Sequence, residues 1–180
     1  MESLTARLDR PIVLVGLMGA GKSTVGRRLA RRLGLPFIDS DVAIEEANGG
    51  QTTAEIFERY GEPAFRDGER RVVARLIDGT VRVIATGGGA FVDPDTRALL
   101  NQKAVTVWLD APVRVLAERT ARRNNRPMLK VGDPEEILAR LAEARRHAYA
   151  EAHIRIVSGT GAHGTVVEDV MKAVGEWLKR

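Results

Sequence analysis

The sequence of 180 residues contains no cysteine, so it can form neither disulfide bonds nor metal sites built on thiolates. A chain without cysteine suits a reducing compartment, and we expect a cytoplasmic protein. No stretch reaches about 18 consecutive apolar residues, and the first ten residues lack the apolar core and cleavage site of a signal peptide. We therefore expect no membrane-spanning helix, no signal peptide and no membrane partner.

The histidines match no metal-binding spacing, and we expect all three on the surface: His147, His153 and His163.

Aromatic residues are also scarce, at 4% of the chain, and they do not alternate with the basic residues. This excludes the rows of stacking rings on which single-stranded nucleic acids bind. The formal net charge of +4 suits an anionic small molecule as well as a nucleic acid. Because the arginines form no single tail and several fall beside a glycine-rich segment, we expect a small-molecule substrate and no nucleic-acid partner.

That glycine-rich segment, GLMGAGKST at residues 16–24, fits the pattern G-x-x-x-x-G-K-[ST]. An apolar run at 12–15 precedes it as a buried strand would, and a helical pattern that ends at Gly34 follows it. In this geometry, backbone N–H groups converge on a phosphate chain at a helix N-terminus. Lys22 can then reach the β- and γ-phosphates, and the Ser23 hydroxyl can ligate Mg²⁺. The flanking pattern favours this P-loop over an ordinary glycine-rich turn with a chance lysine.

Strand-like and helical patterns alternate along the whole chain. The expected strands cover 12–15, 36–38, 81–85, 104–109 and 154–157. Helical patterns cover 25–33, 42–48, 52–61, 64–78, 93–100, a segment that begins at 110–112, 133–152 and 166–178. The alternation indicates an α/β fold, a five-stranded parallel sheet covered by helices on both faces. We expect one domain over 1–180, with an insertion at about 42–78.

Polar or glycine-rich residues follow two further expected strands directly, so they should meet the P-loop at one edge of the sheet. Asp39 and Asp41 come after the second strand. One carboxylate beside Mg²⁺ can orient the metal's water shell, and another can accept a hydrogen bond from a substrate hydroxyl. The alternative is that one or both only cap the helix at Val42. Gly87-Gly88-Gly89, after the third strand, lets a ligand lie against the backbone; a flexible loop is the alternative.

The ordered set of motifs resembles the shikimate kinase family over essentially the whole chain. The resemblance rests on GLMGAGKSTVG at 16–26, Asp39-x-Asp41 with Ile44-Glu45, Ile56-Phe57 with GExxFR at 61–66, GGG at 87–89, RPML at 126–129 and Arg145-x-x-x-Tyr149. It implies ATP-dependent phosphorylation of the 3-hydroxyl of shikimate, in the pathway to chorismate and the aromatic amino acids. It also implies a nucleoside-monophosphate-kinase-like fold with strand order 2-3-1-4-5 and a mobile lid.

The resemblance further implies roles for the residues around the acceptor. Asp41 corresponds to the carboxylate that holds the substrate hydroxyls. Arg66 and Arg145 correspond to the pair that grips the substrate carboxylate, for which a planar guanidinium is well shaped; seen alone, both would be interpreted as solvated helix charges. The expected acceptor-binding residues are Asp41, Arg66, Gly87, Gly88, Gly89 and Arg145.

The expected nucleotide site includes a lid. From about Arg119 to Gly132 the helical periodicity fails and positive charge accumulates. The resemblance implies that Arg126 closes over the transferring phosphates and that Arg119 contacts the nucleotide; an exposed basic loop is the alternative. The expected cofactor-binding residues are Gly19, Ala20, Gly21, Lys22, Ser23, Thr24, Arg119 and Arg126. We assign Mg²⁺ to Ser23 and, through water, to Asp39.

Lys22, Asp41 and Arg126 are the expected catalytic residues. Phosphoryl transfer needs mainly positioning and electrostatic stabilisation, so Asp41 is a stronger candidate as a substrate ligand than as a general base. The alternatives to a shikimate kinase are another small-molecule P-loop kinase of the gluconate or nucleotide type, and a non-catalytic nucleotide- or nucleic-acid-binding module. We expect a monomer, because no long apolar stripe remains once the core is assigned.

Overall fold

A parallel five-stranded sheet forms the centre of the computed structural model, which describes residues 3–122, 132–159 and 163–180. The strands are β1 (Ile12–Val15), β2 (Phe37–Asp39), β3 (Val83–Ala85), β4 (Val105–Asp110) and β5 (Ile154–Val157). Their order in the sheet is β2-β3-β1-β4-β5, and every neighbouring pair is parallel. The α/β class and the strand order are therefore confirmed.

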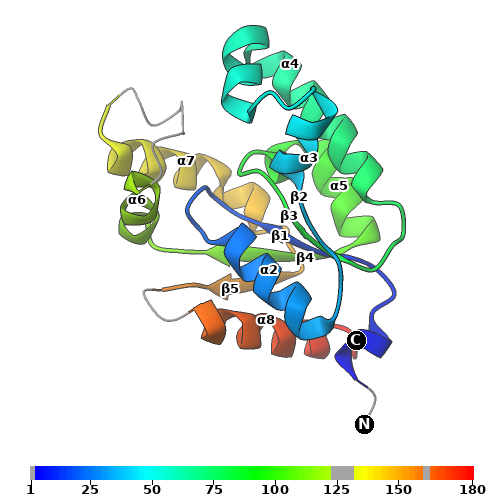
Figure 1. The fold of residues 1–180 in the computed structure, drawn as a ribbon. Coiled ribbons are helices and arrows are strands. Elements are labelled where there is room, and N and C mark those ends of the chain that lie inside the picture. Colours follow the sequence, from blue (N-terminus) through cyan, green and yellow to red (C-terminus); the bar gives the residue numbers. More distant parts are fainter. Residues whose placement is uncertain (1–2, 123–131, 160–162) are drawn as a thin grey trace.

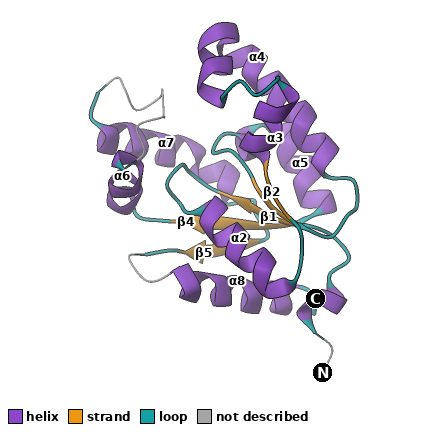
Figure 2. Ribbon diagram, viewed as in Figure 1, coloured by secondary structure: helices purple, strands orange, loops and turns teal. Residues whose placement is uncertain are grey.

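Helices cover both faces of this sheet (Figures 1 and 2). They are α1 (Leu4–Arg7), α2 (Lys22–Leu33), α3 (Ser40–Ala47), α4 (Thr53–Leu76), the 3₁₀ helix η1 (Ala90–Val92), α5 (Pro94–Lys103), α6 (Val113–Ala121), α7 (Pro134–Tyr149) and α8 (His163–Trp177). In Figure 1, α2 and α8 lie together on one face, and α5 and α7 lie on the other. This two-sided cover explains the continuous apolar run of β1, whose four residues are all 0% exposed.

Local chemistry explains where several helices begin. Thr52 and Glu55 form a capping box at the start of α4, and Asp93 caps α5 with Pro94 at its first position. The two helices expected at 52–61 and 64–78 form one element with a kink at Gly61, where φ is +82°. That backbone conformation is one that glycine adopts without steric cost.

Other boundaries differ from the prediction. The helix expected from Val42 begins at Ser40, because Asp39 already caps it. The aperiodic segment expected from Arg119 begins later, since α6 continues to Ala121. Helix α1 was not predicted, since four residues are too few for a periodic pattern.

The segment between β2 and β3, which holds α3 and α4, carries an apolar cluster of its own beside the main core. It consists of Ile44 from α3 and three residues of α4: Ile56, Phe65 and Val72. Thus α4 stands above the sheet as a packed wall rather than an open loop (Figure 1). Across the described parts of the chain, none of the helices combines the length and apolar character that crossing a membrane requires.

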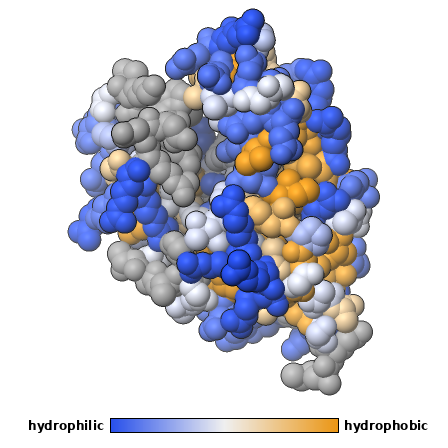
Figure 3. All heavy atoms as spheres, viewed as in Figure 1, coloured by the Kyte–Doolittle hydropathy of each residue, from blue (hydrophilic) through white to orange (hydrophobic). Residues whose placement is uncertain are grey.

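Part of the positive charge lies away from the strand ends. Four arginines of α2 are exposed, and Figure 3 shows the surface over this helix as strongly hydrophilic: Arg27, Arg28, Arg31 and Arg32. Part of the net positive charge of the chain therefore lies on the outer surface of α2, and not only around the P-loop.

His153 is half-buried, so the expectation that all three histidines lie on the surface is wrong for this residue. Its Nδ1 accepts a hydrogen bond from the Thr106 N–H at 3.2 Å, and its ring lies against Trp177, with centroids 4.8 Å apart. Burial, followed by the positive charge of Arg10, lowers the pKa of His153. A protonated imidazole cannot accept the Thr106 hydrogen bond.

This contact predicts a loss of stability in mild acid. Because the folded-state pKa of His153 is depressed, its contribution is present above the unfolded pKa of about 6.5 and is lost as the pH falls below that value. We expect the melting temperature to fall more between pH 7.5 and pH 5.5 in the unmodified chain than in His153→Asn. Asparagine offers an oxygen acceptor near the Nδ1 position and does not titrate. The melting temperatures are measured by circular dichroism. An equal fall in the melting temperature of both chains would contradict this role.

Candidate active site

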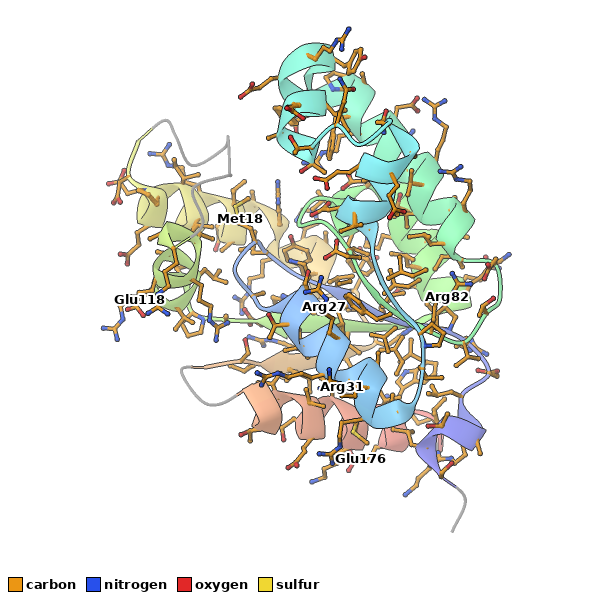
Figure 4. All side chains as sticks on the ribbon, viewed as in Figure 1. Met18, Arg27, Arg31, Arg82, Glu118 and Glu176 are labelled. Carbon is orange, nitrogen blue, oxygen red and sulfur yellow. The ribbon has the colours of Figure 1, made fainter. Side chains whose placement is uncertain are left out.

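A cavity of about 280 Å³ opens at the carboxyl ends of β1, β2 and β3. Parallel strands bring their following loops to one edge, and here the P-loop, α3, α4, the glycine loop and α7 all contribute to the walls. Figure 4 shows Met18 on the P-loop, between α7 and the helices α3 and α4. The cavity brings together all of the residues predicted for metal and acceptor binding: Ser23, Asp39, Asp41, Arg66, Gly87, Gly88, Gly89 and Arg145.

The P-loop has the geometry that its sequence predicts. Gly19 has φ +82°, and a Cβ there would lie 2.9 Å from the carbonyl oxygen of Leu116. Ala20 and Gly21 lead into the first turn of α2, which holds Lys22, Ser23 and Thr24. The Lys22 ammonium donates to the carbonyl oxygens of Gly16 and Leu17, both at 2.8 Å. It thus lies inside the loop, where a phosphate chain would be cradled.

Ser23 and Asp39 form the oxygen-rich part of the site. The Ser23 hydroxyl donates to Oδ2 of Asp39 at 2.5 Å, while Oδ1 of Asp39 accepts the N–H of Asp41 at 3.0 Å. Asp39 therefore caps α3 with one oxygen and faces the P-loop with the other. Asp41 is not the cap, since it lies within the first turn of the helix.

These donors suit Mg²⁺ rather than a metal enclosed by protein ligands. Among the described residues, no group of three or more histidine or acidic side chains could enclose a metal. One hydroxyl and one carboxylate at a P-loop are the few hard oxygen ligands that Mg²⁺ takes when substrate phosphates and water complete its shell.

The glycine loop allows charged groups to pack directly against the backbone. A Cβ at Gly87 would lie 2.8 Å from Oδ1 of Asp41 and 2.9 Å from Oε1 of Glu69. A Cβ at Gly89 would lie within 2.6 Å of Nη2 of Arg66. Three charged side chains therefore occupy the space that ordinary residues would fill at this strand end.

Glu69 is a site residue that the sequence did not single out. Only 3% of it is exposed; Oε2 accepts from Nη1 of Arg66 at 2.8 Å, and Oε1 has no hydrogen-bond partner among the described residues. Burial raises the pKa of Glu69, although the nearby Arg66 and Arg145 oppose this rise. The spacing Arg66-x-x-Glu69 was the available signal, because residues three apart share a helix face.

Arg145 and Arg66 are not solvated helix charges. Arg145 is 9% exposed and donates through Nη1 to the carbonyl oxygen of Gly88 at 3.2 Å. The Arg66 side chain is 25% exposed and is held by Glu69. Both guanidinium groups line the cavity from different helices, α4 and α7. They therefore reach one cavity from two distant parts of the chain.

Arg119 connects the P-loop to the loop after β5. Its Nη1 donates to the carbonyl oxygens of Gly19 at 3.2 Å and Ala20 at 3.4 Å, and its Nη2 donates to Gly159 at 3.1 Å. This position suits a nucleotide contact. Arg126, the expected lid arginine, lies outside the described residues.

Comparison with known proteins agrees with this geometry. The model of the family described as "Shikimate kinase" matches residues 18–175. The shikimate kinase of Caulobacter vibrioides is 56% identical over 173 residues, which cover 96% of this chain and 86% of the relative. That of Novosphingobium aromaticivorans is 50% identical over 183 residues, covering 99% and 94%.

Solved structures show the same relationship. The structure of shikimate kinase from Acinetobacter baumannii in complex with shikimate has a TM-score of 0.89 and 39% identity, and the match covers 96% of this chain and 97% of that one. A gluconokinase from Sinorhizobium meliloti matches with a TM-score of 0.60 at 19% identity, covering 95% and 94%, which shows a shared fold alone. With a family model that spans most of its length and relatives at half identity or more, the chain belongs to the shikimate kinase family.

Proposed function

We propose that this chain transfers the γ-phosphoryl group of ATP to the 3-hydroxyl of shikimate, with the residue roles that follow. The observation that carries the proposal is the convergence of Arg66, Arg145 and Asp41 on the side-chain-free backbone of 87–89, in a cavity continuous with the P-loop residue Ser23. Two guanidinium groups and a carboxylate in one small cavity suit an acceptor that carries both a carboxylate and hydroxyl groups.

Arg66 and Arg145 bind the acceptor carboxylate in this proposal. Arg145 uses one donor on Gly88, and Arg66 uses one on Glu69, which leaves further N–H groups of each planar fork for the ligand. Since both arginines are held by the protein before the ligand arrives, little conformational entropy is lost on binding. The grip fixes the ring and thereby the direction of its hydroxyl groups.

Asp41 and Lys22 act at the reacting end. Asp41 accepts a hydrogen bond from the acceptor hydroxyl and aligns its oxygen with the γ-phosphorus. As the new O–P bond forms, the bond between the γ-phosphorus and the β–γ bridging oxygen breaks, ADP leaves, and the hydroxyl proton is released to water. Lys22 exchanges a loop carbonyl for a phosphate oxygen and stabilises the developing negative charge.

The nucleotide is held by the backbone of residues 19–24 and by Arg119. Ser23, with Asp39 through water, would hold Mg²⁺, which supplies charge neutralisation on the β- and γ-phosphates. Several points stay predictions: a role for Arg126 in closing the site, the insertion at about 42–78 and the lid at about 119–132. The monomeric state, the absence of nucleic-acid and membrane partners, and the cytoplasmic location also stay predictions.

The acceptor assignment predicts which compound stimulates ADP release. In a coupled ADP assay with ATP and Mg²⁺, shikimate should accelerate ADP production, whereas gluconate and nucleoside monophosphates should leave the rate at its acceptor-free level. Stimulation by gluconate or a nucleotide, without stimulation by shikimate, would overturn the assignment. Salt-sensitive nucleic-acid binding without any acceptor-dependent ADP release would favour the non-catalytic alternative.

Removal of the Arg66 guanidinium should weaken acceptor binding selectively. We expect Arg66→Ala to raise the KM for shikimate about 10- to 100-fold, the usual range for a lost hydrogen bond to a charged group. The KM for ATP should change less than about two-fold, since the nucleotide does not touch this residue. Arg75→Ala, an exposed arginine near the end of the same helix, is the matched control. Equal effects on both KM values would remove Arg66 from the acceptor site.

A single methyl group at Gly87 should disable the site. Gly87→Ala displaces the side chains of Asp41 and Glu69. We expect kcat/KM for shikimate to fall about 100-fold, because a shift of about 1 Å in a group that positions the substrate lowers the rate by this order. The control is Gly68→Ala on α4, where a Cβ meets nothing within 4 Å. This control should keep full activity and unfold at a slightly higher temperature, by helix propensity. Undiminished activity in Gly87→Ala would contradict the close packing of charges on this backbone.

A further inference from the structure

Tyr149 lies at the end of α7, one turn after Arg145, and is 1% exposed. Its hydroxyl donates a hydrogen bond to the carbonyl oxygen of Gly88, the same oxygen that accepts from Nη1 of Arg145. One carbonyl of the glycine loop is thus held by two side chains of a single helix. The cavity residues treated so far contact the ligand space, whereas Tyr149 lies behind the loop, in the main core.

The backbone that these two donors hold has little intrinsic order. Gly88 and Gly89 have no side chains, and glycine can adopt many φ/ψ combinations. In a planar trans peptide, the carbonyl of Gly88 and the N–H of Gly89 point in opposite directions. Fixing the carbonyl toward α7 therefore fixes the Gly89 N–H away from α7. Neither the Gly88 nor the Gly89 N–H donates to another described backbone group.

The phenol ring is itself tightly held. It stacks on Trp108 of β4, with centroids 5.8 Å apart and planes at 28°. The guanidinium of Arg155 also lies over the Trp108 ring, 4.9 Å from its centroid, and its Nε donates to Asp110 at 3.0 Å. A phenylalanine ring would make the same stack, so packing alone does not explain the hydroxyl. Burial raises the pKa of Tyr149, which keeps the phenol protonated and able to donate.

We propose that Tyr149 is a positioning residue for the acceptor: its hydroxyl sets the orientation of the Gly88–Gly89 peptide and thereby presents the loop N–H groups to the ligand. It acts together with Arg145, which binds the same carbonyl and the acceptor carboxylate. The inference deepens the proposed function and rests on it.

The test is Tyr149→Phe, which removes one oxygen atom and keeps the stacked ring. We expect the KM for shikimate to rise about five-fold, the effect of one hydrogen bond, with the KM for ATP unchanged. Amide hydrogen exchange of the segment 87–89, measured by mass spectrometry, should become faster. The matched control is Tyr60→Phe, because Tyr60 is 53% exposed on α4; both KM values and the exchange of 87–89 should then stay unchanged.

An unchanged KM for shikimate in Tyr149→Phe would overturn the inference. An equal rise in both KM values with a lower melting temperature would also overturn it, since that pattern indicates a structural role alone. If Tyr149→Phe is recovered poorly, the same comparison is made with Gly68→Ala present in both chains, which adds helix stability. Failure of the unmodified chain to phosphorylate shikimate would reject the proposed function and this inference together. An active unmodified chain with an unaffected Tyr149→Phe would reject the inference alone.

Discussion

The absence of side chains at residues 87–89 is the constraint on which the proposed acceptor site depends. Asp41 and Glu69 come within about 3 Å of the place where a Cβ of residue 87 would stand, and Arg66 fills the equivalent place at residue 89. Charged groups from α3 and α4 can converge only because nothing projects from the strand end between them. The geometry of the site therefore depends on the lack of a Cβ at these glycines as much as on the charged groups themselves.

The sheet explains why these groups meet. Strands β1, β2 and β3 lie side by side and parallel, so the P-loop, Asp39 and the glycine loop emerge at one edge. The kinked helix α4 then brings Arg66 over that edge, supported by a small apolar cluster of its own. The end of the cavity beside the P-loop is thus built on the central strand, and the end beside Arg66 and Arg145 is built on α4 and α7.

Pairing of opposite charges offsets the free-energy cost of burying charged side chains in this cavity. Glu69 is almost fully buried, and its raised pKa reflects that burial, yet Arg66 pairs with it and Arg145 lies nearby. The buried acid holds Arg66 by a direct hydrogen bond, and the positive charge of Arg145 further compensates its negative charge. A neutral residue at this position would leave Arg66 without its partner on the buried side.

Much of the fold could be predicted because its signals are local. The P-loop pattern, the apolar strands and the caps at Thr52 and Asp93 depend on residues a few positions apart. The burial of Glu69 could not be predicted, since it depends on Arg66 and on a glycine loop that arrives some twenty residues later. Asp39 was read as either a metal residue or a cap, and the structure shows one oxygen capping α3 and the other on Ser23.

Contacts that join distant segments were missed for the same reason. The bond from Tyr149 to Gly88 crosses 61 positions of the chain, and no periodicity records it. His153 was expected on the surface because a lone histidine gives no sign that Thr106 and Trp177 will enclose it. The pair Arg66 and Arg145 was recovered only through the resemblance to a family, because on helices such arginines usually face solvent.

The most direct test of the account is a crystal structure of this chain with shikimate and a non-hydrolysable ATP analogue bound together. We predict that the shikimate carboxylate accepts hydrogen bonds from both Arg66 and Arg145, with the ring against residues 87–89 and a hydroxyl between Asp41 and the γ-phosphate. A ring bound elsewhere, with the two arginines contacting only protein, would contradict it.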